Sequence, residues 1–398
     1  LYQQILPEEV QATFLQWRRG ETTFTAIEES EFQIKLGEYL NTFIAKLFDI
    51  EKESESLIDR ATRYETLMTF KEQFIQRGAK RYRQAIEGTF AEHNEKLLTK
   101  LKTTADDADL EFKIAKYALG LDAEKDADEI VAIHQWGALA EADEAGQALI
   151  QDWITFKFPA RLDFDNLVAT KETTFHGIPV KVGSKPLRQR DGFDLTDHRM
   201  DRYEIASEIA YCKYCHDHDG DFCSTGFPVK KGDPTQGFRK NPFDETLSGC
   251  PLDEMISEMQ RLEKDGLSIG SLAITMVENP MVPATGHRIC NDCMKSCIYQ
   301  RAEPVNIPQI ETGVLSTVLD LPYGVEIYNL LARWNPLKPT DYLPGEENGR
   351  KVLVAGMGPA GFTMAHYLSQ QGCHVVGIDG LKIEPLPESV LTQPIERW

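Results

Sequence analysis

Apolar residues recur at helical spacing through the first 165 residues of the chain. The clearest repeats, three or four residues apart, are Leu36, Leu40, Phe43, Ile44 and Leu47, followed by Leu97, Leu98 and Leu101. This period places apolar side chains along one face of a helix. Glycine and proline are sparse here, and cysteine is absent. The pattern predicts a helical domain over residues 1–165, whose role the sequence does not indicate.

The pattern changes after residue 165. Residues 173–182 contain Gly177 and Pro179 as boundaries, which predicts a short strand or hairpin. A helix is expected over residues 202–210, and further helices over 251–278, broken near Gly266 and Gly270. These elements predict a helical second domain, residues 166–345. Residues 335–349 carry prolines and glycines without an apolar period and read as a linker.

The C-terminal part, residues 346–398, has the pattern of one β-α-β unit. An apolar strand over 351–355 leads into a glycine-rich turn, a helix to about Gln371 and a second strand over 375–378. The fold class expected is therefore mostly α, followed by the first β-α-β unit of an α/β Rossmann-like domain. The residues after Ile378 are too few to complete such a sheet, so we expect this domain to be incomplete in the chain.

The turn of this unit carries the dinucleotide fingerprint Gly356-x-Gly358-x-x-Gly361. The first glycine permits the tight turn, the second lets the backbone approach a pyrophosphate, and the third allows close packing of helix and strand. Asp379 follows the second strand, where a carboxylate accepts from ribose hydroxyls and disfavours a 2′-phosphate. The pattern favours FAD or NAD over NADP; the alternative is a turn kept only for its shape.

The charge and the hydropathy of the chain disfavour several classes of binding partner. The chain has 43 Lys and Arg against 63 Asp and Glu, a formal charge of −20. This balance disfavours nucleic acid and anionic membrane surfaces, and the sequence has no apolar run long enough to span a bilayer. The chain starts with Leu1 and lacks a signal-peptide pattern, so we expect it to begin inside a longer product.

Seven of the eight cysteines fall in two groups. They are Cys212, Cys215 and Cys223, with Cys250 further on, and then Cys290, Cys293 and Cys297. Short loops of this kind ligate iron–sulfur clusters or zinc, and spacing alone favours neither metal. Nearby His216, His218 and His287 could serve zinc. Such metal ligation predicts a reducing compartment, the cytoplasm. Cys373 stands apart and is expected to be a packed residue.

A resemblance to a known family rests on the second group and the residues around it. Asn279-Pro280, Gly286-x-Arg288-x-Cys290, Cys293-x3-Cys297 and Pro304-Val305-x-Ile307-x-x-Ile310-Glu311 occur in that order, followed by Gly356-x-Gly358-Pro359-Ala360-Gly361. This order resembles the N-terminal iron–sulfur region of the glutamate synthase small-subunit family, which includes the N-terminal half of dihydropyrimidine dehydrogenase. The resemblance covers residues 205–380.

The resemblance implies two 4Fe-4S clusters with interleaved ligands. Cys212, Cys215, Cys223 and Cys297 would hold the first cluster, and Cys250, Cys290, Cys293 and Glu311 the second. The alternative role for Glu311 is that of a carboxylate near the start of a helix. The family's FAD would bind at Gly356, Gly358, Pro359, Ala360, Gly361 and Asp379, and NAD(P)H would bind in the complete enzyme, beyond Trp398.

Two departures from the family pattern affect the second cluster: residues 224–249 separate Cys223 from Cys250, and Cys290 and Cys293 are unusually close. The expectation is an electron-transfer oxidoreductase that passes electrons between NAD(P)H, FAD and two clusters. Its partner would be a redox protein or a second catalytic domain, with oligomer formation left open. The alternative is a zinc-stabilised interaction or scaffold module attached to a non-catalytic Rossmann remnant. No catalytic acid–base pair can be assigned from the sequence.

Overall fold

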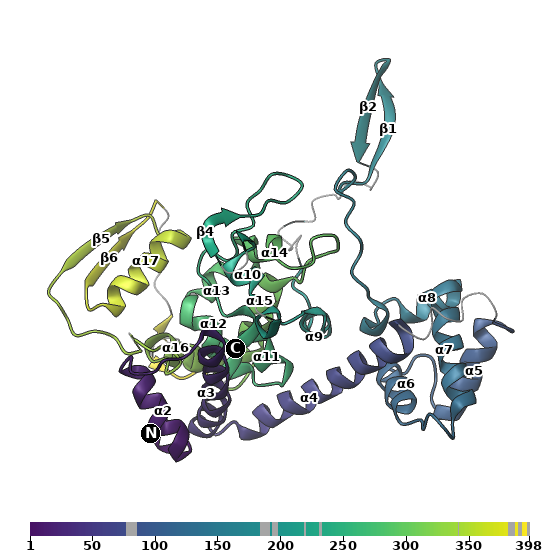
Figure 1. Ribbon diagram of the computed structural model, residues 1–398, viewed down its shortest axis with the longest axis horizontal. Coiled ribbons are helices and arrows are strands. Elements are labelled where there is room, and N and C mark those ends of the chain that lie inside the picture. Colours follow the sequence, from purple (N-terminus) through teal and green to yellow (C-terminus); the bar gives the residue numbers. More distant parts are fainter. Residues whose placement is uncertain are drawn as a thin grey trace.

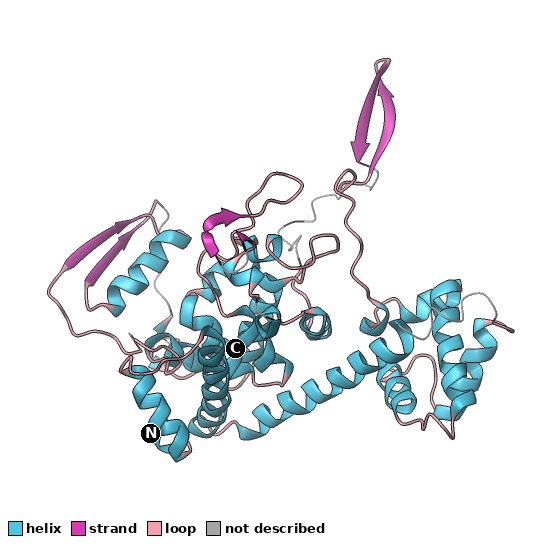
Figure 2. Cartoon of the chain, in the orientation of Figure 1, coloured by secondary structure: helices cyan, strands magenta, loops and turns pink. Residues whose placement is uncertain are grey.

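The protein is described by a computed structural model of the 398-residue chain. The structure describes residues 1–76, 86–183, 192, 198–218, 220–230, 233–340, 342–380, 387–388 and 392–395. In these residues helices predominate, and the strands form three separate two-stranded sheets (Figure 2). The expected mostly α class is confirmed.

The elements follow one another along the chain as two helical stretches and a short α/β unit. The first stretch comprises α1 (Tyr2–Ile5), α2 (Glu8–Arg18), α3 (Ala26–Leu47), α4 (Glu51–Phe70), the π-helical η1 (Lys71–Gln76), α5 (Phe90–Leu101), α6 (Leu110–Leu119), α7 (Ala127–Ala142), α8 (Glu144–Ile150) and the 3-10 turn η3 (Ile154–Phe156). The hairpin strands β1 (Thr170–Phe175) and β2 (Ile178–Gly183) then precede α9 (Arg202–Tyr211), η4 (Cys215–His218) and α10 (Phe222–Thr225).

The second stretch begins with a small sheet and continues in helices. Its elements are β3 (Pro228–Lys230), β4 (Asp233–Phe238), α11 (Ile256–Lys264), α12 (Ser268–Glu278), α13 (Val282–Thr285), η5 (Gly286–Arg288), α14 (Asp292–Lys295), α15 (Ile307–Leu319) and α16 (Gly324–Arg333). The last unit is β5 (Lys351–Ala355), α17 (Pro359–Gln370) and β6 (His374–Ile378). Residues 381–386, 389–391 and 396–398 of the expected dinucleotide domain lie outside the described part.

Polar residues fix where several helices begin. Thr25 accepts from the backbone N–H of Glu28 while the Glu28 carboxylate accepts from the backbone of Thr25, which forms a capping box at the start of α3. Asp201 and Glu204 form the same arrangement at α9. A capping box satisfies two N–H groups that a helix leaves without internal partners. The cap at Asp201 fixes the start of α9, and therefore the place where Cys212 follows its last turn.

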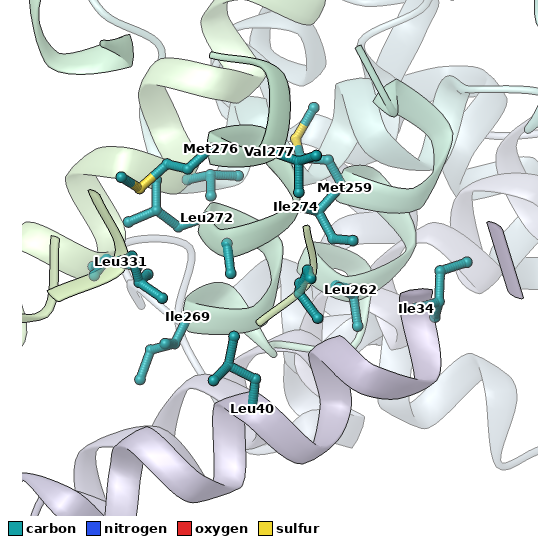
Figure 3. Close-up of a cluster of buried hydrophobic side chains, with 14 of the residues drawn as sticks. Ile34, Leu40, Met259, Leu262, Ile269, Leu272, Ile274, Met276, Val277 and Leu331 are labelled. Carbon is teal, nitrogen blue, oxygen red and sulfur yellow. The ribbon is translucent and has the colours of Figure 1, made fainter. Parts of the chain in front are cut away.

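The first hydrophobic core joins the N-terminal helices to the cysteine-bearing part of the chain. Its buried residues come from positions 2–57 and from positions 205–337. Figure 3 shows Leu40 on α3 facing Ile269 of α12, with Leu262 of α11 close by. The α3 and α12 backbones approach closely at two glycines, since a Cβ added to Gly270 would lie 2.5 Å from the carbonyl oxygen of Gly37.

A second core lies beyond the long helix α4. Its buried residues run from Leu67 to Ile154, with Trp136 nearly inaccessible at 1% exposure. Figure 1 shows α4 reaching from the body around α3 and α11 to the group formed by α5–α8. The hydrophobic clusters therefore divide the chain within α4 rather than at the expected boundary at residue 165.

Several local predictions can be compared directly with the elements. The hairpin expected over residues 173–182 is confirmed as the antiparallel pair β1–β2, which projects from the body in Figure 1 and turns through His176 and Gly177, both with positive φ. The helix expected over 202–210 is confirmed as α9. The break expected near Gly266 is confirmed, since α11 ends at Lys264 and α12 begins at Ser268. The break expected near Gly270 is wrong, because this glycine lies inside α12, where its small size permits the contact with α3.

The expected linker is partly core. Leu337 is 0% exposed, and the buried Asn335 side chain donates from Nδ2 to the carbonyl oxygen of Ala273. The linker reading is therefore wrong for these residues, while residue 341 lies outside the described part. From Leu343 to Arg350 the side chains are exposed, and this segment leads to β5.

The β-α-β unit has the expected element order. β5 and β6 pair in parallel, Leu353 opposite Val376, and α17 connects the two strands. Leu353 and Val376 are 63% and 50% exposed, so one face of this two-stranded sheet is open. Among the helices of the described residues, none has the length and apolar character needed to cross a membrane.

Candidate cysteine and dinucleotide sites

Four cysteines from three separate segments gather into what we call the first cysteine group, Cys212, Cys215, Cys223 and Cys297. Cys212 directly follows α9, Cys215 opens η4, Cys223 lies in α10, and Cys297 follows α14. The Cys297 thiol interacts electrostatically with each of the other three. Residues 74 or more positions apart in the sequence thus meet at one buried site.

Burial dominates the chemistry of this group. Burial first, and then the neighbouring cysteines, raise the pKa of Cys212 to about 12 and that of Cys215 to about 11. Burial also raises the pKa of the Cys223 thiol well above its ordinary value. Thiolates packed together without water repel one another, so only a bound cation makes four ionised thiolates stable here. Metal binding at this site would therefore release protons.

The second cysteine group consists of Cys250, Cys290 and Cys293, together with the Glu311 carboxyl. The Cys293 pKa is raised by burial first, then by Glu311, Cys250 and Cys290. Cys290 is exposed, whereas Cys293 and Glu311 are buried. Glu311 lies in the second turn of α15, whose start is capped by the Asn306 side chain accepting from the backbone of Gln309. Its position and burial allow the Glu311 carboxyl to act as a fourth ligand beside the three cysteines.

A second buried carboxyl belongs to the same place and was missed by the sequence analysis. Glu254 is 7% exposed, and its side chain is hydrogen-bonded to that of Glu311. Burial, followed by Glu254, raises the pKa of Glu311 well above its ordinary value. Glu254 also acts electrostatically on Cys250 and Cys293. The available signal was an acid four residues after Cys250, just before the amphipathic helix α11, and acids before helices are too common to single one out.

The insertion between Cys223 and Cys250 folds back on itself. The backbone N–H of Cys250 donates to the carbonyl oxygens of Cys223 (2.9 Å) and Ser224 (2.8 Å). Gly249 makes this approach possible, because its φ is +82° and a Cβ there would collide with the Ser224 carbonyl oxygen. Cys223 and Cys250 are therefore neighbours in space although they are far apart in the sequence. They nevertheless belong to different cysteine groups.

Backbone N–H groups point at several of the sulfurs. The Tyr214 N–H donates to Cys212 Sγ at 3.3 Å. The Cys250 thiol accepts from the N–H groups of Glu254 and Leu252. Burial raises the pKa of the Cys297 thiol, and the N–H groups of Tyr299 and Val305 oppose this rise in part. Donors of this kind stabilise the thiolate form and are one of the means by which proteins tune metal–sulfur sites.

The three histidines near the cysteines do not complete a thiolate site. His216 lies with Glu31 and Asp217, and these three are the one set of His, Cys, Asp and Glu ligand atoms within the described residues that all lie within 4.8 Å of one another. The Arg261 guanidinium is placed among them, 2.5 Å from Glu31 and 3.4 Å from both Asp217 and the His216 ring. The Arg261 guanidinium thus supplies the positive charge that a metal ion would otherwise supply at this place. His287 contacts Thr312 Oγ1 at 3.2 Å, and His218 is exposed.

The glycine-rich turn has the shape that the fingerprint predicts. Gly356 has φ of +95°, and space is open around the Cβ positions of Gly356 and Gly358. A Cβ on Gly361 would instead collide with the Gly356 carbonyl oxygen, so this third glycine permits close packing of α17. Pro359 and Ala360 open α17, where a proline is favoured in the first turn. The turn can approach a phosphate without steric hindrance.

Asp379 lies at this turn, directly after β6. Its Oδ2 accepts from the backbone N–H of Met357 at 2.6 Å, so the carboxylate faces the glycine-rich loop and is exposed. The fingerprint glycines and Asp379 therefore meet at the carboxyl ends of β5 and β6, the edge at which α/β sheets bind ligands.

Helix α17 also docks on the helical body near the second cysteine group. Tyr367 donates to the carbonyl oxygen of Glu278 at 3.2 Å, and Gln370 donates to that of Ala332 at 2.7 Å. Burial raises the pKa of Tyr367, with further contributions from Glu278 and Glu254. Glu254 therefore connects the second cysteine group electrostatically with the helix of the dinucleotide turn.

Comparisons with known proteins found two relatives with uninformative names. Uncharacterized protein RP006 of Rickettsia prowazekii is 55% identical over 118 residues, which are 30% of this chain and 17% of that protein. Uncharacterized protein RP005 of the same organism is 26% identical over 247 residues, 59% of this chain and 80% of that protein. This chain thus spans less than a fifth of the first relative. No family model and no solved structure matches the chain.

Proposed function

We propose that this chain is the electron-transfer part of an oxidoreductase that holds two 4Fe-4S clusters and an FAD. The observation that supports it most is the partition of the ligands. Cys297 acts electrostatically on Cys212, Cys215 and Cys223, while Glu311, Cys250 and Cys290 act on Cys293, which in turn lies close enough to act on Cys223. Each set offers four ligands, and the two sets interleave along the sequence, as the family resemblance implies.

The spacing of the sulfurs favours iron–sulfur clusters over zinc. Four thiolates bound to one zinc at about 2.3 Å lie about 3.8 Å apart in a tetrahedron. Within the described residues, no three of the cysteine sulfurs meet even a 4.8 Å limit. A cubane carries its thiolates on four separate iron atoms and needs a wider spacing. A single zinc would therefore require the cysteine sulfurs to move closer together, whereas the wider spacing of a cubane would not.

The chain's own residues have definite roles in this proposal. The cysteine thiolates and the Glu311 carboxylate would ligate, the N–H groups of Tyr214 and Glu254 would stabilise sulfur charge, and the apolar core would exclude water. Gly356 and Gly358 would admit a pyrophosphate, and Asp379 would accept from a ribose hydroxyl. When bound, the flavin would supply two-electron chemistry with NAD(P)H, and the clusters one-electron transfer.

The position of α17 sets the expected direction of transfer. Because Tyr367 docks beside Glu278 and near Glu254, the second cysteine group lies on the side of the β-α-β unit. The first group lies against the stacked rings of Tyr211 and Tyr299, whose centroids are 4.1 Å apart and which are only partly buried. We propose that electrons move between the flavin side and a partner through the second group and then the first.

Metal and sulfide analysis of anaerobically purified chain tests this function. Two cubanes give about eight iron and eight acid-labile sulfide per chain, with broad absorption in the visible. Stoichiometric zinc without iron would overturn the proposal in favour of a zinc-stabilised scaffold module. The Cys373→Ser variant serves as the control, because this half-buried thiol belongs to neither cysteine group and its loss should leave the iron content unchanged.

A further inference from the structure

A cavity of about 420 Å³ lies beside the first cysteine group, outside every site described so far. One wall comes from Arg161, Leu162 and Phe164, another from the insertion between Cys223 and Cys250, and a third from Gln300 and Arg301. Its size falls within the range of small-molecule sites, roughly 300–1,000 Å³.

Backbone contacts hold these walls together. Arg161 forms a bridge with Ala302, and the Leu162 N–H donates to the carbonyl oxygen of Arg301 at 3.1 Å. In the insertion, Arg239 donates to Phe227 at 2.8 Å. Gln300 Nε2 donates to the carbonyl oxygen of Cys297 at 2.6 Å, which ties the cavity to the first cysteine group. The cavity is thus a built feature rather than a gap between loose loops.

The charge of the lining is opposite to that of the chain. Arg161, Arg239, Lys240 and Arg301 line the cavity, and its described lining includes no acidic residue, in a chain with a formal charge of −20. Lys240 is paired with Asp244 at 2.8 Å, but the described residues supply no ion pair to any of the three arginines. Three arginines in one lining, with no ion pair from the described residues, make the entry of an anion favourable.

The apolar part of the lining is aromatic. Phe164 and Phe227 line the cavity, and each ring packs against a second aromatic ring. Phe227 stacks on Phe222, with centroids 4.1 Å apart and an interplanar angle of 1°, and Phe164 packs edge-on against Phe243. Aromatic rings fixed in this way offer contact area to a flat ring, as in other sites that combine stacking with arginine.

We propose that this cavity binds a small anion that carries a flat ring, of the size of a mononucleotide. The arginines would hold the phosphate, and Phe164 and Phe227 would contact the ring. The Asn241 amide is already used within the insertion, where its oxygen accepts from Phe243 and Glu245, and Gln300 donates to Lys295 and Cys297. With the Asn241 amide and the Gln300 Nε2 engaged, recognition depends mainly on charge and ring contact, so we expect the site to discriminate weakly between bases.

Calorimetric titration of the full chain with AMP, adenosine and inorganic phosphate tests the proposal. AMP should bind at least tenfold more tightly than either adenosine or phosphate, because only AMP offers both the ring and the charge. The double variant Arg239→Gln/Arg301→Gln should weaken AMP at least tenfold. Both arginines are exposed, so the fold should persist, and Arg161→Gln gives an independent second variant.

Two controls keep this site distinct from the dinucleotide turn. Lys171→Gln removes an exposed charge from β1 that is not part of the cavity and should leave AMP binding unchanged. Asp379→Ala should also leave it unchanged. Absence of AMP binding, or equal binding by the arginine variants, would overturn the proposal. AMP binding lost in Asp379→Ala but kept in the arginine variants would assign the ligand to the dinucleotide turn and leave the proposed electron-transfer function standing.

Discussion

The backbone N–H of Cys250 donates a hydrogen bond to the carbonyl oxygen of Cys223 at 2.9 Å, although residues 224–249 separate the two in sequence. The insertion therefore leaves the body and returns to the same point. The family pattern has only a short connection here, and this contact provides the equivalent proximity. The long spacing consequently does not argue against a second cluster ligated by Cys250.

Shortening this insertion should preserve the iron content. Pro228 and Phe238 are paired across β3 and β4, so their backbones already have the separation that a two-residue hairpin turn spans. We expect a variant in which residues 229–237 are replaced by two glycines to keep iron and sulfide within error of the parent, measured after anaerobic purification. A loss of half of the iron would instead mean that the excursion positions Cys250.

Replacing Cys215 by Ser should remove the first cluster and destabilise the loops around it. η4 and α10 are short, and few apolar side chains hold them, so metal–thiolate bonds would take the part of a core there. We expect iron to fall from about eight to about four per chain, and the thermal midpoint to drop. An unchanged midpoint and iron content in Cys215→Ser, compared with the Cys373→Ser control, would reject a ligand role.

The Glu254–Glu311 pair predicts a graded series at the second cluster. Glu311→Ala removes a ligand and should halve the iron content, whereas Glu311→Gln keeps an oxygen ligand and should retain more. Glu254→Ala leaves the ligand but removes its hydrogen-bond partner, a change that typically weakens metal affinity about 10–100-fold. Iron release to a chelator should therefore be faster in Glu254→Ala than in the exposed-site control Glu245→Ala. Spectra of Glu311→Ala identical to the parent would assign this carboxylate to the helix instead.

Local features were predictable because local chemistry determines them. The hairpin around Gly177, the helix over residues 202–210 and the Gly356–Gly361 turn each depend on residues a few positions apart. The partition of the cysteines came from the resemblance, since spacing alone favours no particular pairing of loops that lie far apart in the sequence.

Features that depend on distant partners were not predictable. The apolar face of α3 shows that it must be covered, but does not show that α11 and α12 cover it; a domain of its own was the simpler expectation. Gly270 looked like a helix breaker because its partner, Gly37, lies far away in the chain. Glu254 likewise could not be recognised as part of the second cysteine group from the sequence, because only the fold places Glu311 of α15 beside it.

A pH-dependent stability effect is expected at Glu263, near the end of α11. Burial raises its pKa from the ordinary 4.5 to about 7, while a hydrogen bond from Ser268 opposes the shift only partly. One of its carboxylate oxygens, Oε2, is buried without a partner among the described residues. As the pH rises from 4.5 to 7, the unfolded chain loses this proton while the folded chain keeps it. The free energy of unfolding therefore falls over this interval and stays lower above it.

Glu263→Gln removes this cost, because glutamine resembles the protonated acid and does not titrate. The variant and the parent should have similar stability near pH 4.5. The variant should then become more stable as the pH rises through 7, by about 1–3 kcal/mol at pH 8, as the size of the pKa shift implies. Thermal midpoints followed by circular dichroism between pH 5 and 8 measure the difference. Glu172→Gln, at an exposed position on β1, should follow the parent at every pH. A difference between Glu263→Gln and the parent that is constant with pH would show that the Glu263 carboxyl does not titrate in this range.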